Sequence, residues 1–397
     1  MKRRPVIPVM LTGLLLVAVL LLLFFDPGTG QAGEAGSRTG VSLLYASPGS
    51  MSQLLITGQI DAFIVWESVV STATLSGTGK MIATPETMPP PGEWGDAACC
   101  VLVLRNDLIE ENPDIAALLS ALTTVAVERV NEDPDQAENI TAEWVFGTKP
   151  LLTPAGPLEP VSIEQQAFKN LVFTSTAVLP DMGSLSGLSG TVPPAGAVID
   201  MAVAEQGRRY LNGTLPLPDY HGKPEISLDL GYLPTSDHNA PLYVMVMDAE
   251  YFCDRYGFCL MPGTVTGRET EARLIVGGQE VASVSLVPGQ SGGGVMTTIG
   301  QKALDGAYLG SVPAELQIGL GNPSSIIQSI NSGGTGLVVS PRAPCNDWNT
   351  FIGWAEARSL QGRPLVIATV QSSIQEEMIR SALAYENITV ELYGSSD

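Results

Sequence analysis

The sequence predicts an α/β protein with two lobes of similar design, each a mixed sheet flanked by helices. Residues 41–67 (VSLLYASPGSMSQLLITGQIDAFIVWE) combine an apolar run, a Ser-Pro break, apolar residues at helical spacing and a second apolar run, which predicts a strand, a helix and a strand. Residues 296–315 (MTTIGQKALDGAYLGSVPAE) repeat the order of helix, glycine, aspartate and short strand. We interpret the repeat as two related lobes, although the same order also builds single βαβ units in unrelated folds.

The composition is that of a large, acidic globular protein. With 397 residues the chain can bury a substantial core. Its 41 acidic and 20 basic residues give a net charge of −21, which argues against nucleic acid and anionic membrane surfaces as partners. The carboxylates are spread along the chain, which is typical of the solvated surface of an exported protein.

The N-terminal segment predicts export. Lys2, Arg3 and Arg4 precede an apolar run over residues 6–25, so the positive-inside rule places the rest of the chain outside the cytoplasm, in the periplasm or at the cell surface. The run is long enough to span a bilayer. An uncleaved anchor and a cleaved signal peptide over residues 1–25 are both open, and residues 26–40 are expected to form a flexible tether.

The rest of the chain divides into three predicted segments. Residues 41–148 are expected to form the α/β material of the second lobe, and residues 226–397 that of the first. Residues 149–225 are expected to hold a linker and helices that return the chain to the other lobe. The strongest candidate boundary is the turn-rich stretch of residues 212–223. Residues 179–195 read as a Gly/Ser/Pro loop to which we assign no role.

Apolar periodicity and capping residues predict the individual elements. Strands are expected at residues 98–107, 226–233, 272–278, 281–287 and 364–369. Helices are expected at residues 112–130, 133–147, 161–172, 197–211, 347–360 and 375–385.

Four short loops follow predicted strands and carry small polar residues immediately before helices. They are residues 235–239, 290–294, 311–313 and 371–373. Serine and glycine at such positions leave backbone N–H groups at the positive end of a helix, where an anion or carboxylate binds well. Each loop alone is equally an ordinary helix cap, but four at one edge of a sheet predict a ligand site. The Gly292–Gly294 run is not a phosphate loop, because no GK[ST] follows it.

The five cysteines predict no metal site. An exported chain permits disulfides, and Cys253 and Cys259 flank a predicted helix end where they could pair. Cys99 and Cys100 are adjacent in a predicted strand, where one side chain faces each way, and we interpret both as small buried apolar residues. No metal-ligand spacing is present, and two histidines exclude a histidine-rich site, so neither a metal nor a cofactor is expected.

Several stretches together resemble a known family. LGYLPTSDHNAPLYV, GQSGGGVMTTIGQKALDGAYLGSVPAEL, IATVQSSIQEEMI and LLITGQIDAFIVWESVVSTATLSGTGKMI are similar to segments of ABC-transporter substrate-binding proteins of the nitrate/sulfonate/taurine and thiamine-pyrimidine-precursor type, which have the periplasmic binding protein type II fold. The resemblance implies two lobes joined by a hinge, a small ligand captured between them, an ABC permease as partner, and a monomer. It covers nearly everything from Val41 onward.

The order of the matching segments differs from that of the family. In the family the GYLPTSDHNA strand comes first, and the VSLLY…IVWE stretch follows the IQEEMIRSALAY helix. Here the second-lobe material comes first, which predicts a circular permutation with residues 212–223 connecting what are elsewhere the two termini. A tandem gene that lost its outer halves and an assembly artefact are the alternatives.

The resemblance also implies a set of ligand-contacting residues. They are Ser47, Trp66, Glu67, Thr235, Asp237, His238, Ser291, Gly292, Gly310, Ser311, Gln371, Ser372 and Ser373. Trp66 either stacks on a ligand or belongs to the core, and His238 either donates to an acid or caps a helix. Glu67 would favour a donor-rich ligand, unless it points to solvent.

The leading functional hypothesis is a solute-binding protein without catalytic residues. A membrane-tethered ligand sensor or accessory module is the alternative, suggested by the apolar N-terminal run. An enzyme that forms a pyrimidine precursor is disfavoured, because that branch uses a longer cysteine cluster and more histidines. Two histidines also give no convincing Ser-His-Asp arrangement.

Overall fold

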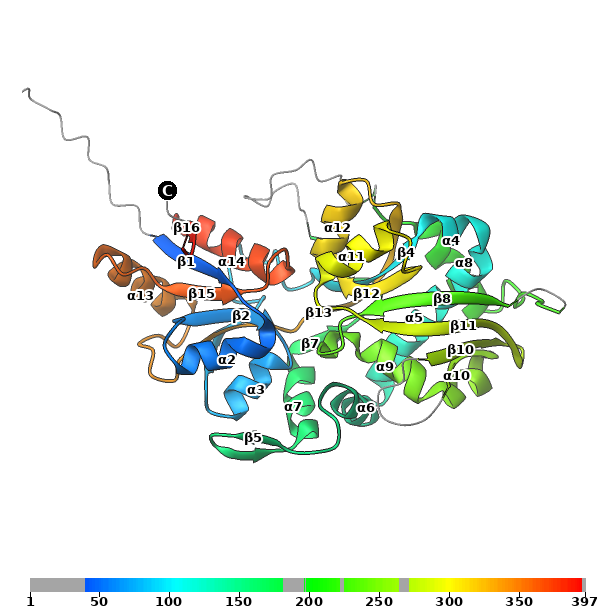
Figure 1. Cartoon of the computed structure of the whole chain (residues 1–397), viewed down its shortest axis with the longest axis horizontal. Coiled ribbons are helices and arrows are strands. Elements are labelled where there is room, and N and C mark those ends of the chain that lie inside the picture. The colour runs from blue at the N-terminus through cyan, green and yellow to red at the C-terminus, as the bar shows by residue number, and fades with distance from the viewer. Residues whose placement is uncertain (1–39, 181–195, 197, 222–224, 264–270, 395–397) are drawn as a thin grey trace, which may run out of the picture. The chain divides into compact units, whose positions relative to one another are not determined.

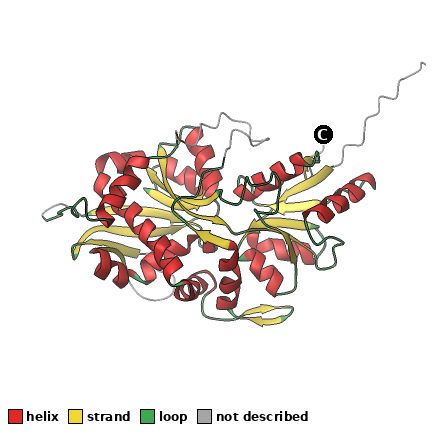
Figure 2. Cartoon of the chain, turned by 180° about the vertical axis from the view of Figure 1, so that it is seen from behind, coloured by secondary structure: helices red, strands yellow, loops and turns green. Residues whose placement is uncertain are grey.

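The computed structural model describes residues 40–180, 196, 198–221, 225–263 and 271–394. The predicted anchor or signal, nearly all of the tether and most of the loop at residues 179–195 lie outside this described part. None of the helices within it is long and apolar enough to cross a membrane. The α/β fold class with mixed sheets and flanking helices is confirmed (Figures 1 and 2).

A six-stranded sheet is built from the two ends of the described chain (Figure 1). Its order is β16 (Thr389–Leu392), β1 (Gly40–Tyr45), β15 (Val366–Thr369), β2 (Ala62–Trp66), β14 (Thr335–Val339) and β3 (Lys80–Ala83). The first four strands run parallel, and β14 is antiparallel to both of its neighbours. The accompanying helices are α2 (Pro48–Ile56), α3 (Val69–Leu75), α13 (Trp348–Leu360) and α14 (Ile374–Tyr385). We call this part, residues 40–83 and 335–394, lobe A.

An eight-stranded sheet forms the second part, lobe B, within residues 98–333. Its order is β7 (Leu171–Phe173), β13 (Ser324–Gly333), β4 (Ala98–Arg105), β12 (Gly306–Gly310), β8 (Ile226–Tyr232), β11 (Gln279–Pro288), β10 (Glu271–Val276) and β9 (Phe258–Pro262). Its helices are α4 (Asn106–Glu111), α5 (Pro113–Glu132), α6 (Pro134–Phe146), α7 (Pro160–Ala167), α8 (Met201–Leu211), α9 (Ala240–Met247), α10 (Ala249–Tyr256), α11 (Gly292–Gly300) and α12 (Ser311–Gly319). A short hairpin, β5 (Leu151–Thr153) and β6 (Gly156–Leu158), lies between α6 and α7.

Local sequence explains most of these elements. Pro48, Pro113 and Pro134 each stand in the first turn of a helix, where the missing N–H costs nothing.

The aromatic core of lobe B is centred on Trp144, whose ring stacks on Tyr243 at 4.8 Å between centroids and meets Tyr232 edge-on at 6.1 Å. Cys253 and Cys259 form a disulfide where α10 passes into β9.

The helix expected at residues 161–172 ends earlier than predicted. Residues 161–172 were expected to be helical throughout, but α7 ends at Ala167 and residues 171–173 form β7. β7 pairs with residues 331–333 of β13. The tertiary strand pairing therefore outweighs the local helical periodicity at this position.

Sheet membership differs from the predicted division into lobes. Residues 41–148 contribute strands to both sheets, and so do residues 226–397. The chain crosses from lobe A to lobe B after β3 and returns between β13 and β14. The physical reason is that alternation of side chains marks a strand but does not specify which strand it pairs with.

Gly334 lies between β13 and β14, where the chain returns from lobe B to lobe A, and residues of both lobes contact it. Its φ is +67°, and an added Cβ would lie 2.4 Å from Leu171 Cδ2 and 2.6 Å from His238 Nε2. Its N–H donates to the Asn170 carbonyl at 2.6 Å, and its carbonyl accepts from the Glu67 N–H at 2.8 Å. Only glycine combines this backbone conformation with so little space.

Gly334→Ala is expected to lower the free energy of unfolding by about 2–4 kcal/mol, because it adds both a strained φ and a close contact. The matched control is Gly353→Ala at an exposed position of α13, where an added Cβ meets no atom within 4 Å. That change is expected to be neutral or to stabilise by up to about 1 kcal/mol. Urea denaturation measures both, and equal midpoints would contradict the packing described around Gly334.

Candidate ligand-binding site

The candidate site is a cavity of about 60 Å³ lined by residues of both lobes. Lobe A contributes Trp66 from the end of β2 and residues 371–375 at the start of α14. Lobe B contributes Cys99 and Cys100 of β4 and His238 of the short helix η3 (Asp237–Asn239). Because about 10–15 Å³ of cavity space holds one water molecule, this cavity has room for a small molecule.

A neighbouring cavity of about 600 Å³ continues from the first. Both are lined by Pro48, Trp66, Leu233 and Gln290. The larger cavity extends between α2, α3 and the C-terminal end of α6, where it reaches Phe146. The two together give a path from the small cavity along the boundary of the lobes.

Four helices begin at the small cavity. Pro48 opens α2, Gly292 opens α11, Gly310 is the N-cap of α12 and Ser373 is the N-cap of α14, and all four line the cavity. The Ser373 hydroxyl accepts from the Glu376 N–H at 3.2 Å, which satisfies one backbone donor of α14. The remaining N–H groups and the helix dipoles favour negative charge at this place.

The residues expected to contact a ligand fall into three groups. Those lining the small cavity are Trp66, His238, Ser291, Gly292, Gly310, Gln371, Ser372 and Ser373. Ser47 and Thr235 line the larger cavity. Glu67, Asp237 and Ser311 line neither of these two cavities and are fully buried.

Two of the three buried members, Ser311 and Glu67, form hydrogen bonds within the protein. The Ser311 hydroxyl donates to the Ala98 carbonyl at 2.6 Å. Glu67 accepts from the Ser71 N–H at 2.9 Å, the Ser71 hydroxyl at 2.7 Å and Asn170 Nδ2 at 2.6 Å. Glu67 therefore points neither to solvent nor into the small cavity, and its carboxylate is bound by groups of the protein.

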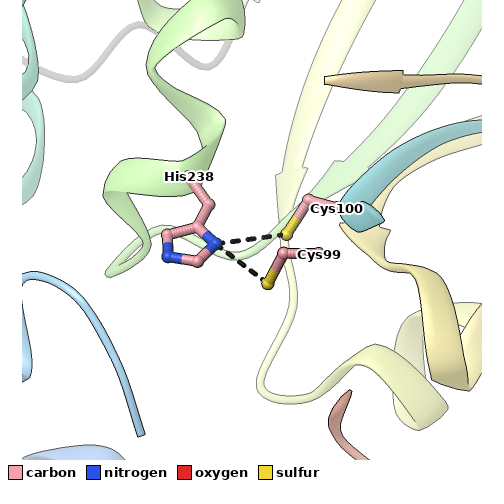
Figure 3. A group of neighbouring side chains, drawn as sticks. All are labelled: Cys99, Cys100 and His238. Atoms are coloured by element: carbon pink, nitrogen blue, oxygen red, sulfur yellow. Dashed lines mark hydrogen bonds between the residues drawn. The ribbon is translucent and has the colours of Figure 1, made fainter. Parts of the chain in front are cut away.

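The two adjacent cysteines differ from the sequence-based interpretation. Instead of facing opposite sides of β4, both sulfur atoms point toward His238 (Figure 3). His238 Nδ1 lies 3.1 Å from Cys99 Sγ and 3.9 Å from Cys100 Sγ. The pairing of β4 with β13 shifts register beside Cys100, whose N–H donates to Asn331 Oδ1 at 3.1 Å. This local irregularity breaks the alternation that strand periodicity predicts.

The expectation that no metal ligands come together is therefore corrected. Cys99, Cys100 and His238 offer three ligand atoms that all lie within 4.8 Å of one another. Sequence reasoning missed the group because His238 is 138 residues from Cys100 in the chain. The adjacent cysteines were the only signal available in the sequence.

The thiols and the imidazole perturb each other. The hydrogen bond from Cys100 and the charge of His238 hold the pKa of Cys99 well below its usual range, although burial acts in the opposite sense. The same hydrogen bond, together with burial, raises the pKa of Cys100. Burial alone would lower the pKa of His238, but the charge of Cys99 and the contacts with Cys99 and Gly334 outweigh it and raise the pKa.

Three carboxyl groups are buried behind the cavity. Burial raises the pKa of Glu67, and burial with the charges of Asp237 and Glu67 raises that of Glu164 well above its usual range. For Asp237, burial and the charge of Glu67 outweigh the attraction of His238 and raise the pKa to about 7. His238 Nε2 and Asp237 Oδ1 are 3.9 Å apart. Placing these acids together is costly above neutral pH.

Comparison with known proteins connects this arrangement to a family. Residues 25–145 match the NMT1-like family. Over 107 residues the chain is 34% identical to the uncharacterized protein MJ1180 of Methanocaldococcus jannaschii, a match that covers 27% of this chain and 71% of the archaeal protein. The chain belongs to the NMT1-like family. The matched region contains β1, β2 and β4, and thus Trp66, Cys99 and Cys100 of the cavity.

A solved structure is also similar, at a low level. The unliganded open form of MppA, a periplasmic murein tripeptide binding protein, is 12% identical with a TM-score of 0.25. The similarity covers 74% of this chain and 51% of that chain, so this chain spans about half the length of the matched structure. At this TM-score the likeness carries no further inference.

The buried acids predict a stability that falls as pH rises. Since the pKa of Asp237 is about 7 in the folded state and near 4 when unfolded, the folded state binds more protons between these values and loses stability as pH rises through them. Asp237→Asn is expected to raise the free energy of unfolding at pH 8 by about 1–3 kcal/mol and to flatten the pH profile.

The control for this prediction is the exposed Asp254→Asn, which is expected to change stability by less than about 0.5 kcal/mol. Thermal unfolding between pH 5 and pH 8 compares the two variants with the wild type. A profile for Asp237→Asn that is as steep as that of the wild type would contradict the role assigned to this carboxyl group.

Proposed function

We propose that this chain is an extracytoplasmic solute-binding protein of an ABC importer. It captures one small molecule between its two lobes and presents the molecule to a membrane permease. The observation that carries the proposal is one cavity lined from both lobes, at which four helices begin. Membership of the NMT1-like family supports it.

The cavity favours a small acid or an acidic heterocycle. Backbone N–H groups at the helix N-termini attract negative charge. Trp66 offers an indole ring and an Nε1 donor that is buried and has no hydrogen-bond partner among the described residues. Nitrates, sulfonates, carboxylates and pyrimidines are the candidate classes, and the small volume excludes large peptides from this cavity.

Ligand capture works by shifting a conformational equilibrium. A ligand that contacts α14 of lobe A and α11 of lobe B gains both sets of contacts only when the lobes are close together. Binding therefore stabilises the closed arrangement that the permease recognises. No bond in the ligand is made or broken in this function.

Native mass spectrometry of the freshly purified full chain is the direct test. We expect one small molecule per chain, released on denaturation, and a thermal shift of about 3–5 °C when the matching compound is added at 100 times its Kd. The panel is nitrate, alkyl sulfonates, small carboxylic acids and phosphorylated and free pyrimidines. A protein that is purified empty and is not stabilised by any of them contradicts the proposal.

Cavity variants are expected to weaken binding of the compound found. Trp66→Phe and Gln371→Ala each remove the side-chain donor group of a residue that lines the cavity, which predicts an increase in Kd of about 5–20-fold. Gln53→Ala on the exposed face of α2, outside both cavities, is the matched control and is expected to leave Kd unchanged. Isothermal titration measures all three, and equal Kd values would place the ligand elsewhere.

We also propose that the chain is a circular permutant of the family's usual order. Parallel pairing of β1 with β16 supports this, because it brings the first and last strands of the described chain together in one sheet. A variant that joins residue 394 to residue 26, and opens the chain between residues 212 and 223, is expected to fold with a Tm within about 10 °C of the wild type. Residues 26–39 then supply the crossover that parallel strands need. An unfolded product would contradict the proposal.

A further inference from the structure

The strongest unassigned feature is the group of Cys99, Cys100 and His238 at the small cavity. All three side chains are buried, with exposed fractions of 3%, 6% and 1%. The two cysteines lie on β4, and His238 lies on η3 directly before α9. We propose that these three residues bind one thiolate-seeking metal ion of the zinc class, with a fourth position open to the cavity.

The spacing of the ligand atoms fits tetrahedral coordination. With metal–sulfur bonds of about 2.3 Å and a metal–nitrogen bond of about 2.05 Å, a tetrahedral site has N–S edges of about 3.6 Å and an S–S edge of about 3.8 Å. The observed distances from Nδ1 to the two sulfurs, 3.1 Å and 3.9 Å, lie on either side of this edge. All three ligand atoms lie within 4.8 Å of one another, so shifts of up to about one ångström in side-chain position complete the site.

The surroundings orient the histidine for this role. His238 Nε2 lies 3.1 Å from the Gly334 carbonyl and donates to it, which leaves Nδ1 directed at the two sulfurs. A metal-binding histidine characteristically donates its other N–H to a carbonyl or carboxylate in this way. Gln375 Nε2 lies 3.8 Å from Cys99 Sγ while donating to Thr335 Oγ1 at 2.9 Å, so the thiol has an oriented neighbour from lobe A.

The donor set selects the kind of ion. Two thiolates and one imidazole are soft ligands that favour zinc-class ions over magnesium or calcium. Each coordinating thiol releases its proton to solvent, and two thiolates then balance a divalent charge inside the protein. The third free cysteine of the described chain, Cys345, is not part of the group.

The open fourth position allows an atom of a bound ligand to coordinate the metal. A site with three protein ligands and an open position accepts an oxygen or nitrogen atom from a bound molecule. Coordination of a bound ligand by the metal rests on the proposed function, because that function places a small acidic ligand in this cavity. Metal binding by the three residues does not depend on it.

The test is a titration of the metal-free full chain, purified under anaerobic conditions, with zinc alone in competition with a chelator. We expect one zinc per chain, and an increase in Kd of more than about 100-fold in Cys99→Ser, Cys100→Ser and His238→Gln, because each removes one of three protein ligands. Cys345→Ser is the matched control and is expected to bind as the wild type does. Unchanged zinc binding in any of the three variants would overturn the site.

Cobalt gives a second measurement that does not depend on the variants folding. Cobalt bound to the wild type is expected to show thiolate-to-cobalt charge transfer and the visible bands of tetrahedral geometry. Absence of the charge-transfer band would overturn the proposal. The ligand panel is applied separately to the metal-free protein. Ligand binding without zinc binding would contradict only the metal site, and zinc binding without ligand binding would contradict only the proposed function.

Discussion

The carbonyl oxygen of Gly334 is the point on which the rest of the site depends. It accepts from the Glu67 N–H at 2.8 Å and from His238 Nε2 at 3.1 Å, so one atom at the crossing between the sheets contacts both the residue that follows β2 of lobe A and η3 of lobe B. The first contact places Trp66 beside the cavity. The second leaves His238 Nδ1 directed at Cys99 and Cys100.

This arrangement concentrates polar groups where the lobes meet. Glu67, Glu164 and Asp237 are buried there together with His238, and the raised pKa of Asp237 follows from that burial. Stability is therefore lost as pH rises. The aromatic core around Trp144 belongs to lobe B and reaches this boundary through Tyr243, whose hydroxyl donates to the Ser236 carbonyl at 2.7 Å.

Some of the fold and of the site could be predicted from sequence because local chemistry determines it. The strand, helix and strand at residues 41–67 formed as expected, and eight of the thirteen expected ligand contacts line one cavity. Glu67, Asp237 and Ser311 could not be placed, because a loop position does not tell whether a side chain turns into a cavity or into the protein. The prediction of a helix through Val172 was wrong because residues 171–173 pair with β13 as a strand.

The sequence by itself determined the α/β class, the caps that start the helices and the loops that carry small polar residues. These depend on neighbouring residues, so a local pattern is enough to specify them. Only the tertiary structure decided that residues 98–105 pair with β12 and β13, and that two adjacent cysteines share one side with a histidine 138 residues away. Alternation with a period of two marks a strand but carries no information about its partner, and the register shift at Asn331 that turns both sulfurs toward His238 arises only once that partner is in place.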